Sequence, residues 1–107
     1  MMEHLKRGDN IDFIAQFDES TISVSDIQSA VLTVKNMGNL VNHPIDELVI
    51  DNLNNQVRYS FTQEETLEFK PNTFVYIELA ILSKDKRQCV VSVMARTSDV
   101  LFNEVLT

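Results

Sequence analysis

Residues 56–94 read QVRYSFTQEETLEFKPNTFVYIELAILSKDKRQCVVSVM and contain three apolar runs in which apolar and polar residues largely alternate. The runs are Val57–Phe61, Phe74–Leu82 and Cys89–Met94, and the polar block Thr62–Asn72 separates the first from the second. Alternation with a period of two is typical of a strand that buries one face. Strands at intervals of roughly ten residues, joined by turns, indicate an all-β sandwich.

The flanking sequence continues the strand pattern. Ile11–Phe17 and Ala30–Lys35 alternate in the same way, and Glu47–Asp51 reads as a shorter strand. The Asn-rich residues 51–55 predict a turn that closes a hairpin onto the first apolar run. Leu40–Asp46 reads as a loop. We therefore predict about six or seven antiparallel strands in one sandwich.

Two capping-box patterns predict one short helical turn each. Ser25–Gln28 has the pattern between two predicted strands, and Thr62–Glu65 has it directly after the first apolar run. The second turn is expected to carry Leu67 and Phe69 into the core. Asn36–Asn39 contains Gly and Asn, which tolerate positive φ, and is predicted to be a tight turn.

The length and composition fit a single folded domain. The chain has 107 residues, of which 44% are hydrophobic and 23% charged, which is ordinary for a globular protein. We predict a flexible arm over residues 1–9 and one sandwich over residues 10–107. No apolar run approaches the roughly 20 residues that span a bilayer. The first residues lack the apolar segment of a signal peptide, so we expect none.

The charge and the cysteine content exclude further classes. The net charge is −7 and the nine Lys and Arg residues are scattered, whereas nucleic acid and acidic membranes require a concentrated basic face. Cys89 is the single cysteine, so an intrachain disulfide is excluded. Because Cys89 lies in a strand pattern, we expect a small buried apolar side chain there.

Several short patterns resemble chemical sites. Glu64, Glu65 and Glu68 form an acidic cluster, but glycosidase chemistry needs two carboxylates that face each other across a substrate, and capping explains this cluster better. His43 lacks partners at zinc spacing. Arg7–Asp9 matches an integrin-binding tripeptide, and we expect a turn at the strand entry instead. Since no phosphate loop or catalytic triad order is present, we expect no enzyme, metal or cofactor.

A carbohydrate- or cell-surface-binding sandwich is the alternative function. Phe74 and Tyr76 could form a platform for a sugar ring, whereas Tyr59 is expected in the core. Aromatic residues make up only 7% of the chain and Trp is missing, which disfavours this class.

One segment resembles a known family. Residues 61–69, FTQEETLEF, and Val75–Leu79, VYIEL, resemble a small protein of phages and prophages of Gram-positive bacteria. That family has a Thr-Gln-Glu-(Glu/Asp)-Thr-Leu-x-Phe crossover, a Val-x-Ile-x-Leu strand and a tail similar to residues 98–105. The likeness covers residues 8–106. The sequence departs from the family at Ser83–Arg87, where the family usually has a Gly-containing turn. This departure changes the geometry of the turn more than it affects the assignment to the family.

The resemblance implies an immunoglobulin-like β-sandwich of an uncharacterised virion or tail-module family with no catalytic residues to transfer. We therefore expect a non-enzymatic structural or assembly protein that is made in the cytoplasm of a bacterial host and built into the virion. Its expected partners are other virion or tail proteins or copies of itself. Sandwiches leave edge strands open for such pairing.

Phe102, Val105 and Leu106 are the predicted protein contact, and the alternative is that they complete the core. If they join copies, light scattering behind size exclusion should give a mass above the 12.2 kDa of one chain. Phe102→Asp should restore the single-chain mass, because an apolar contact disfavours a buried carboxylate. A monomer of 12.2 kDa at every concentration would exclude self-assembly and leave another partner to be found.

Overall fold

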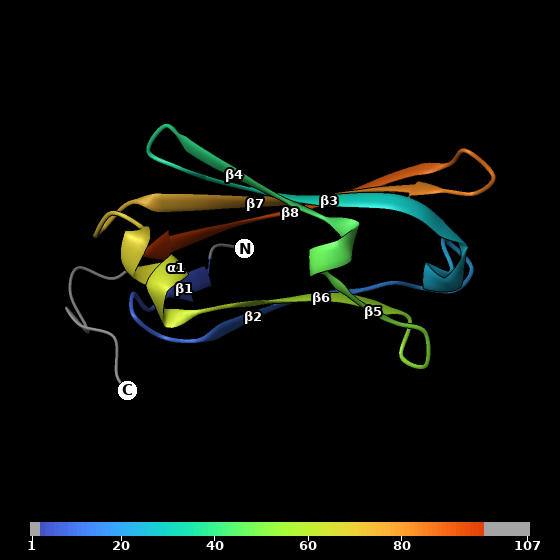
Figure 1. Cartoon of the computed structure of the whole chain (residues 1–107), viewed down its shortest axis with the longest axis horizontal. Coiled ribbons are helices and arrows are strands. Elements are labelled where there is room, and N and C mark those ends of the chain that lie inside the picture. Colours follow the sequence, from blue (N-terminus) through green and yellow to red (C-terminus); the bar gives the residue numbers. More distant parts are fainter. Residues whose placement is uncertain (1–2, 98–107) are drawn as a thin grey trace.

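The computed structural model describes residues 3–97, which form two packed β-sheets (Figure 1). The prediction of an all-β sandwich is confirmed. In chain order the elements are β1 (Glu3–Leu5), β2 (Ile11–Gln16), the 3-10 helix η1 (Val24–Asp26), β3 (Ile27–Asn36), β4 (Asn39–Pro44), the 3-10 helix η2 (Ile45–Glu47), β5 (Val49–Asp51), β6 (Gln56–Phe61), α1 (Gln63–Glu68), β7 (Phe74–Ser83) and β8 (Gln88–Thr97).

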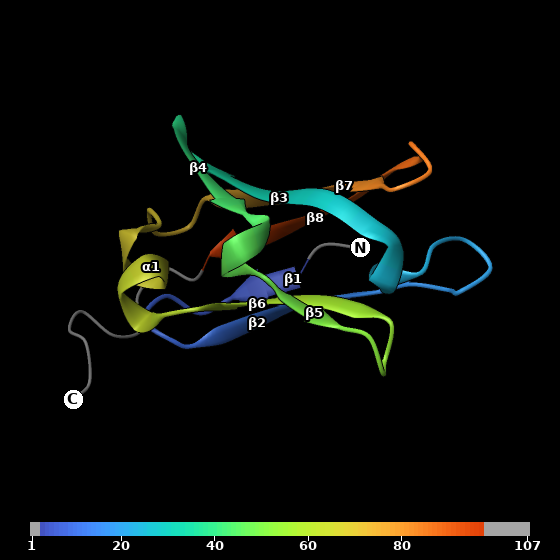
Figure 2. The same cartoon turned by 45° about the vertical axis from the view of Figure 1, so that its right-hand side comes forward.

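The larger sheet has the strand order β1-β8-β7-β3-β4, and the smaller sheet has the order β2-β6-β5. Seven strands pair antiparallel, as predicted, and β1 pairs parallel with β8. Figure 2 shows the two layers, with η2 crossing from β4 to β5 along one side. Two packed sheets of largely antiparallel strands, with the chain passing repeatedly between them, make the fold a β-sandwich.

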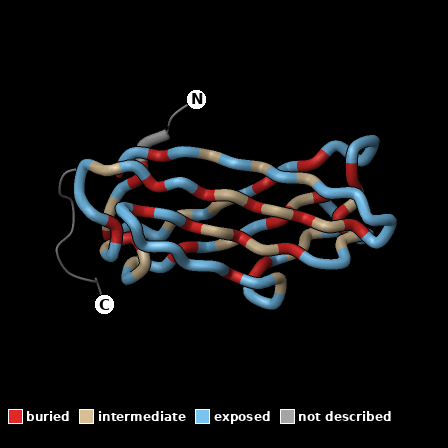
Figure 3. The backbone as a smooth tube through the Cα atoms, turned by 90° about the horizontal axis from the view of Figure 1, so that it is seen from above, coloured by how far each residue is buried: buried red, intermediate tan, exposed pale blue. Residues whose placement is uncertain are grey.

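The core lies between the sheets and follows the alternation of the sequence. On β7 every second residue from Val75 to Ile81 is buried, and Figure 3 shows this alternation along the strands. Leu32 of β3 lies opposite Leu79 of β7 in register, and both are completely buried. Each such side chain contributes about 1.5–3 kcal/mol of transfer free energy, so the β3–β7 pair stabilises the centre of the larger sheet.

The N-terminal segment differs from the predicted arm. From Glu3 onward it belongs to the sandwich, because β1 pairs with β8 and Leu5 is buried. The Gly8 N–H donates to Thr66 Oγ1 at 2.9 Å and thereby ties this segment to α1. A three-residue strand carries too little alternation to be found from sequence, and its partner β8 lies about 90 residues further along the chain.

The prediction of a loop over Leu40–Asp46 is wrong, since Asn39–Pro44 form strand β4. The preceding turn has Met37 and Gly38 at φ of 50° and 86°, the conformation that a two-residue hairpin requires. The hairpin places β4 beside β3, and a proline is tolerated because β4 is an edge strand.

Both predicted helical turns form, as η1 and α1, but only one of the two capping boxes is confirmed. Thr62 Oγ1 accepts from the Glu65 N–H at 3.2 Å, and Glu65 Oε1 accepts from the Thr62 N–H at 3.0 Å. At Ser25–Gln28 there is no such box: η1 follows Ser23, whose side chain makes no capping bond. Gln28 instead lies in β3, because pairing with β7 extends that strand further back than the alternation indicated.

Asn55 joins the turn before β6 to the connection between β2 and β3. Its buried side-chain amide donates to the carbonyl oxygens of Phe17 at 2.9 Å and Ile22 at 3.0 Å. Its Oδ1 accepts from the Val24 N–H at 2.9 Å. The residue has a φ of 53°, which asparagine tolerates better than most residues. One side chain therefore satisfies three backbone groups of a connection that has little regular structure.

Asn55→Ala should lower the free energy of unfolding by about 3 kcal/mol or more. Three buried backbone groups would lose their hydrogen-bond partner, and each such loss costs about 1–3 kcal/mol. Asn55→Gly is the matched control, because it removes the same hydrogen bonds but permits positive φ. Urea denaturation followed by circular dichroism measures both. A loss below about 1 kcal/mol in the alanine variant would contradict the role of these bonds.

Candidate functional site

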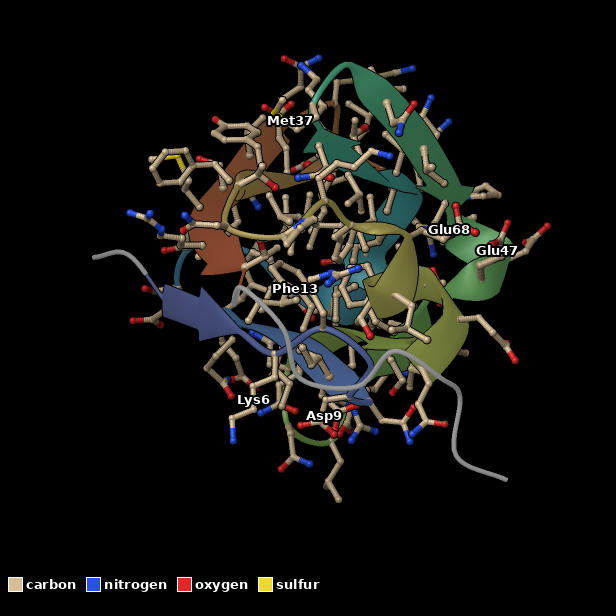
Figure 4. The ribbon with its side chains drawn as sticks, turned by 90° about the vertical axis from the view of Figure 1, so that its left-hand side faces the viewer. Lys6, Asp9, Phe13, Met37, Glu47 and Glu68 are labelled. Atoms are coloured by element: carbon tan, nitrogen blue, oxygen red, sulfur yellow. The ribbon has the colours of Figure 1, made fainter. Side chains whose placement is uncertain are left out.

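A groove of about 510 Å³ opens between the edge strand β4 and the helix α1. We call it the β4–α1 groove and define it by the residues that line it, which come from β3, β4, β6 and the α1 region: Val34, Asn36, Asn39, Leu40, Val41, His43, Phe61, Glu64, Glu65, Glu68 and Phe69. Figure 4 shows Glu68 and Glu47 on the same side of the molecule, near α1 and η2.

The floor of the groove is apolar and belongs to the core. Val34, Phe61 and Phe69 are buried, and the rings of Phe61 and Phe69 meet edge-to-face with centroids 6.3 Å apart. On the β4 side, Val41 shares the inward face of its neighbour Val34 and retains 51% exposure, while Leu40, 55% exposed, lines the rim of the groove from the other face of the strand. The groove thus leaves apolar surface from both the core and an edge strand accessible to a ligand.

The opposite wall is acidic. Glu64 and Glu68 lie four residues apart on α1, so they share one face of the helix. Both are exposed, and within residues 3–97 neither carboxylate makes a hydrogen bond or an ion pair. Glu65 differs from them because its carboxylate is held by the capping box. The unpartnered negative charge of the groove therefore resides on Glu64 and Glu68.

A cluster around Glu65 holds the groove together. His43 of β4 lies between two carboxylates, with Nδ1 at 2.9 Å from Glu47 Oε1 and Nε2 at 3.5 Å from Glu65 Oε2. Its ring stacks on Tyr59 of β6 at a centroid distance of 4.3 Å. The Tyr59 hydroxyl donates to Glu65 Oε2 at 2.7 Å. The cluster therefore links an edge of the larger sheet to the smaller sheet through α1.

Burial raises the pKa of Tyr59, and the hydrogen bond to Glu65 and the charges of Glu65 and Glu47 raise this pKa further. The phenol therefore stays a donor to the carboxylate at neutral pH. Across the described residues 3–97, no group of three or more His, Cys, Asp or Glu is arranged to hold a metal ion. At His43 the reason is that its two nitrogens face carboxylates on opposite sides of the ring.

The back of α1 is fixed by the N-terminal segment. Thr66 is completely buried, and its Oγ1 donates to the Asp9 carbonyl oxygen at 2.9 Å while accepting from Gly8. Arg7 Nε donates to the Phe69 carbonyl oxygen at 2.8 Å. Residues 7–9 therefore form a turn packed against α1, as expected for the strand entry, and they position the helix that carries the acidic wall.

The structure brings the acidic cluster of the sequence to the groove but adds residues that sequence reasoning missed. Leu40 and Val41 were missed because their segment was interpreted as a loop; their only signal is an apolar pair between asparagines. The predicted contact residues Phe102, Val105 and Leu106 lie outside the described residues.

The aromatic residues considered for sugar binding are divided between the two sheets. Tyr59, expected in the core, is half-buried in the cluster just described. Phe74 and Tyr76 lie on the outer face of β7 with 48% and 37% exposure. The Arg96 guanidinium lies 5.9 Å from the centroid of the Phe74 ring. Cys89, expected to be buried, is half-buried and packs against the core.

Comparison with known proteins leaves the chain unassigned: no family model matches it, and no curated protein matches it. Within the described residues, none of the helices has the length and apolar character needed to cross a membrane. Because no match identifies a function, the functional proposal rests on the geometry of the groove and of the outer face of β7.

Tyr59→Phe tests the cluster. At neutral pH it should cost about 1.5–3 kcal/mol of unfolding free energy, the usual contribution of a hydrogen bond to a charged group. Folding raises the pKa of Tyr59, so the folded chain keeps a proton that the unfolded chain loses above about pH 10. The stability advantage of the wild type over Tyr59→Phe is therefore complete below that pH and declines as the pH rises above it.

Urea midpoints of both proteins at about pH 8 and about pH 11, on either side of the ordinary tyrosine pKa, measure this decline. Taking the difference between the two proteins removes the contributions of groups that do not interact with Tyr59. A difference that stays constant with pH would contradict the role assigned to the Tyr59–Glu65 bond.

Proposed function

We propose that this chain is a non-enzymatic structural or assembly protein of a phage or prophage, and that it acts through protein–protein contacts at the β4–α1 groove. The observation that carries the proposal is the groove itself. An apolar floor lies next to an edge strand whose own apolar side chains are half-exposed.

An edge strand with apolar side chains favours a protein as its ligand. Every second residue of such a strand points its N–H and C=O away from its one neighbour, and these groups can pair with another strand. Covering Leu40 and Val41 would add roughly 25 cal/mol for each Å² of apolar surface removed from water. Backbone pairing and apolar burial together are the means by which strand addition binds partners.

The phage or prophage part of the proposal is supported by sequence and fold together. Residues 61–69 and 75–79 resemble the phage family in the crossover and in the strand that follows. In the structure these segments are the end of β6, the capped helix α1 and the central strand β7. The first of these segments, residues 61–69, thus supplies the acidic wall and part of the floor of the groove.

A carbohydrate-binding module is the second candidate, and the outer face of β7 favours it. Phe74 and Tyr76 are two residues apart, point to the same side and are both exposed. Exposed aromatic rings can stack on the apolar faces of sugars. This face is separate from the groove, so the two functions predict sensitivity to different substitutions.

Density-gradient fractionation of an induced lysate from a strain that carries the gene tests the proposal. We expect the wild type to sediment with particles or their precursors. The Val41→Arg variant should be lost from that fraction, because a charged side chain disrupts the apolar surface that β4 adds to the groove. Val90→Arg is the matched control, since Val90 is also more than half exposed but lies on β8 away from the groove.

A wild-type chain found only as free protein would overturn the assembly function. Binding of the isolated protein to a glycan array, lost in Phe74→Ala and Tyr76→Ala but kept in Val41→Arg, would establish the second candidate instead. Circular dichroism of each variant ensures that the loss does not arise from unfolding.

A further inference from the structure

We infer that the β4–α1 groove takes an extended basic segment of a different protein, which pairs with β4 as an added strand and sets Lys or Arg side chains against Glu64 and Glu68. The inference rests on the proposed function and names the chemistry of the partner.

The open edge of β4 determines how the segment would pair. The two-residue turn makes Asn36 and Asn39 a hydrogen-bonded pair, and the bonded pairs then recur at every second residue of the ladder. The N–H groups of Leu40 and Asn42 therefore point away from β3. Pro44 follows at the next such position, where its lack of an N–H limits the pairing to the first part of the strand.

The apolar floor determines which side chains the segment would carry. A strand added to β4 lies about 4.8 Å from it, and its side chains alternate between the two faces. The inward-facing side chains would lie beside Val41 and face the apolar floor that includes Phe61 and Phe69. Alternate positions of the segment should therefore be apolar.

The acidic wall determines the charge of the segment. The charged residues that line the groove are Glu64, Glu65 and Glu68, and the one titratable base among its lining residues, His43, already lies between Glu47 and Glu65. Because Glu64 and Glu68 have no partner among the described residues, a cation beside them gains attraction without breaking an existing ion pair. The segment should therefore carry Lys or Arg.

This charge disfavours the chain itself as the ligand. Two copies each carry a net charge of −7 and repel one another. Residues 98–107 contain Asp99 and Glu104 but no Lys or Arg, so they do not complement the acidic wall. The loose basic cluster Lys84–Arg87 includes the hairpin turn between β7 and β8, rather than an extended segment. A different, basic protein is the occupant that fits.

Selection from a displayed library of random dodecapeptides on the wild-type protein tests the inference. The enriched peptides should combine Lys or Arg with apolar residues at alternate positions. Fluorescence anisotropy of the synthesised peptides should show at least about ten-fold weaker binding to Glu64→Lys/Glu68→Lys, equivalent to about 1.4 kcal/mol. Glu19→Lys/Asp26→Lys is the matched control, because it makes the same charge change outside the groove and should leave the affinity unchanged.

Hydrogen exchange of the wild type checks the geometry without a variant. The amides of Leu40 and Asn42 should exchange more slowly when the peptide is bound. Asn42→Pro removes an outward N–H while leaving the ladder with β3 paired, and it should weaken binding if circular dichroism shows the fold intact.

Any of three peptide results would overturn the inference: enriched peptides without Lys or Arg, equal binding to both charge-reversed proteins, or protection from exchange confined to other strands. Self-association that disappears in Val41→Arg would also overturn it, because a second copy would then occupy the groove.

If peptide binding fails while the wild type still sediments with particles, the assembly function stands and uses another surface. Peptide binding without sedimentation would instead retain the groove ligand and reject the phage role.

Discussion

The pairing of β3 with β7 is the constraint on which the rest of the sandwich depends. These strands occupy the middle of the larger sheet, and their inward side chains, including Leu32 and Leu79, are excluded from water. Since a shift of one residue would turn the buried row to the solvent, burial enforces the register. β8 and β4 then add on either side, and β4 becomes an edge because the hairpin after β3 ends the sheet.

Glu65 determines how this sheet meets the smaller one at the groove. Its carboxylate caps α1 through Thr62, accepts from Tyr59 of β6 and faces His43 of β4. One side chain thus joins the adjacent elements β6 and α1 to β4, which lies about 20 residues earlier in the sequence. Because Glu65 is used in this way, its neighbours Glu64 and Glu68 remain unpaired on the exposed side of the helix. The same short helix therefore provides both the structural brace and the acidic wall.

The proposed function follows from combining an unpaired strand edge, an accessible apolar floor and uncompensated negative charge at one place. Each feature alone is common on protein surfaces, and their coincidence narrows the ligand to an extended basic segment. The outer face of β7 is a separate surface with a different chemistry, formed by Phe74, Tyr76 and Arg96. A sandwich can use the two surfaces independently, since the groove runs along the edge strand β4 whereas Phe74 and Tyr76 lie on β7, two strands away in the larger sheet.

Sequence alone determined the elements whose signal is local. The alternation over Phe74–Leu82 predicted β7 and its buried row, and Thr62–Glu65 predicted a capped helix, because period and capping depend on neighbouring residues. It also located the acidic cluster, but not the groove. Only the tertiary structure decided that Asn39–Pro44 is a strand, that β1 joins β8, and that His43 meets Glu65. These features arise from contacts between residues far apart in the chain, which local propensity does not encode.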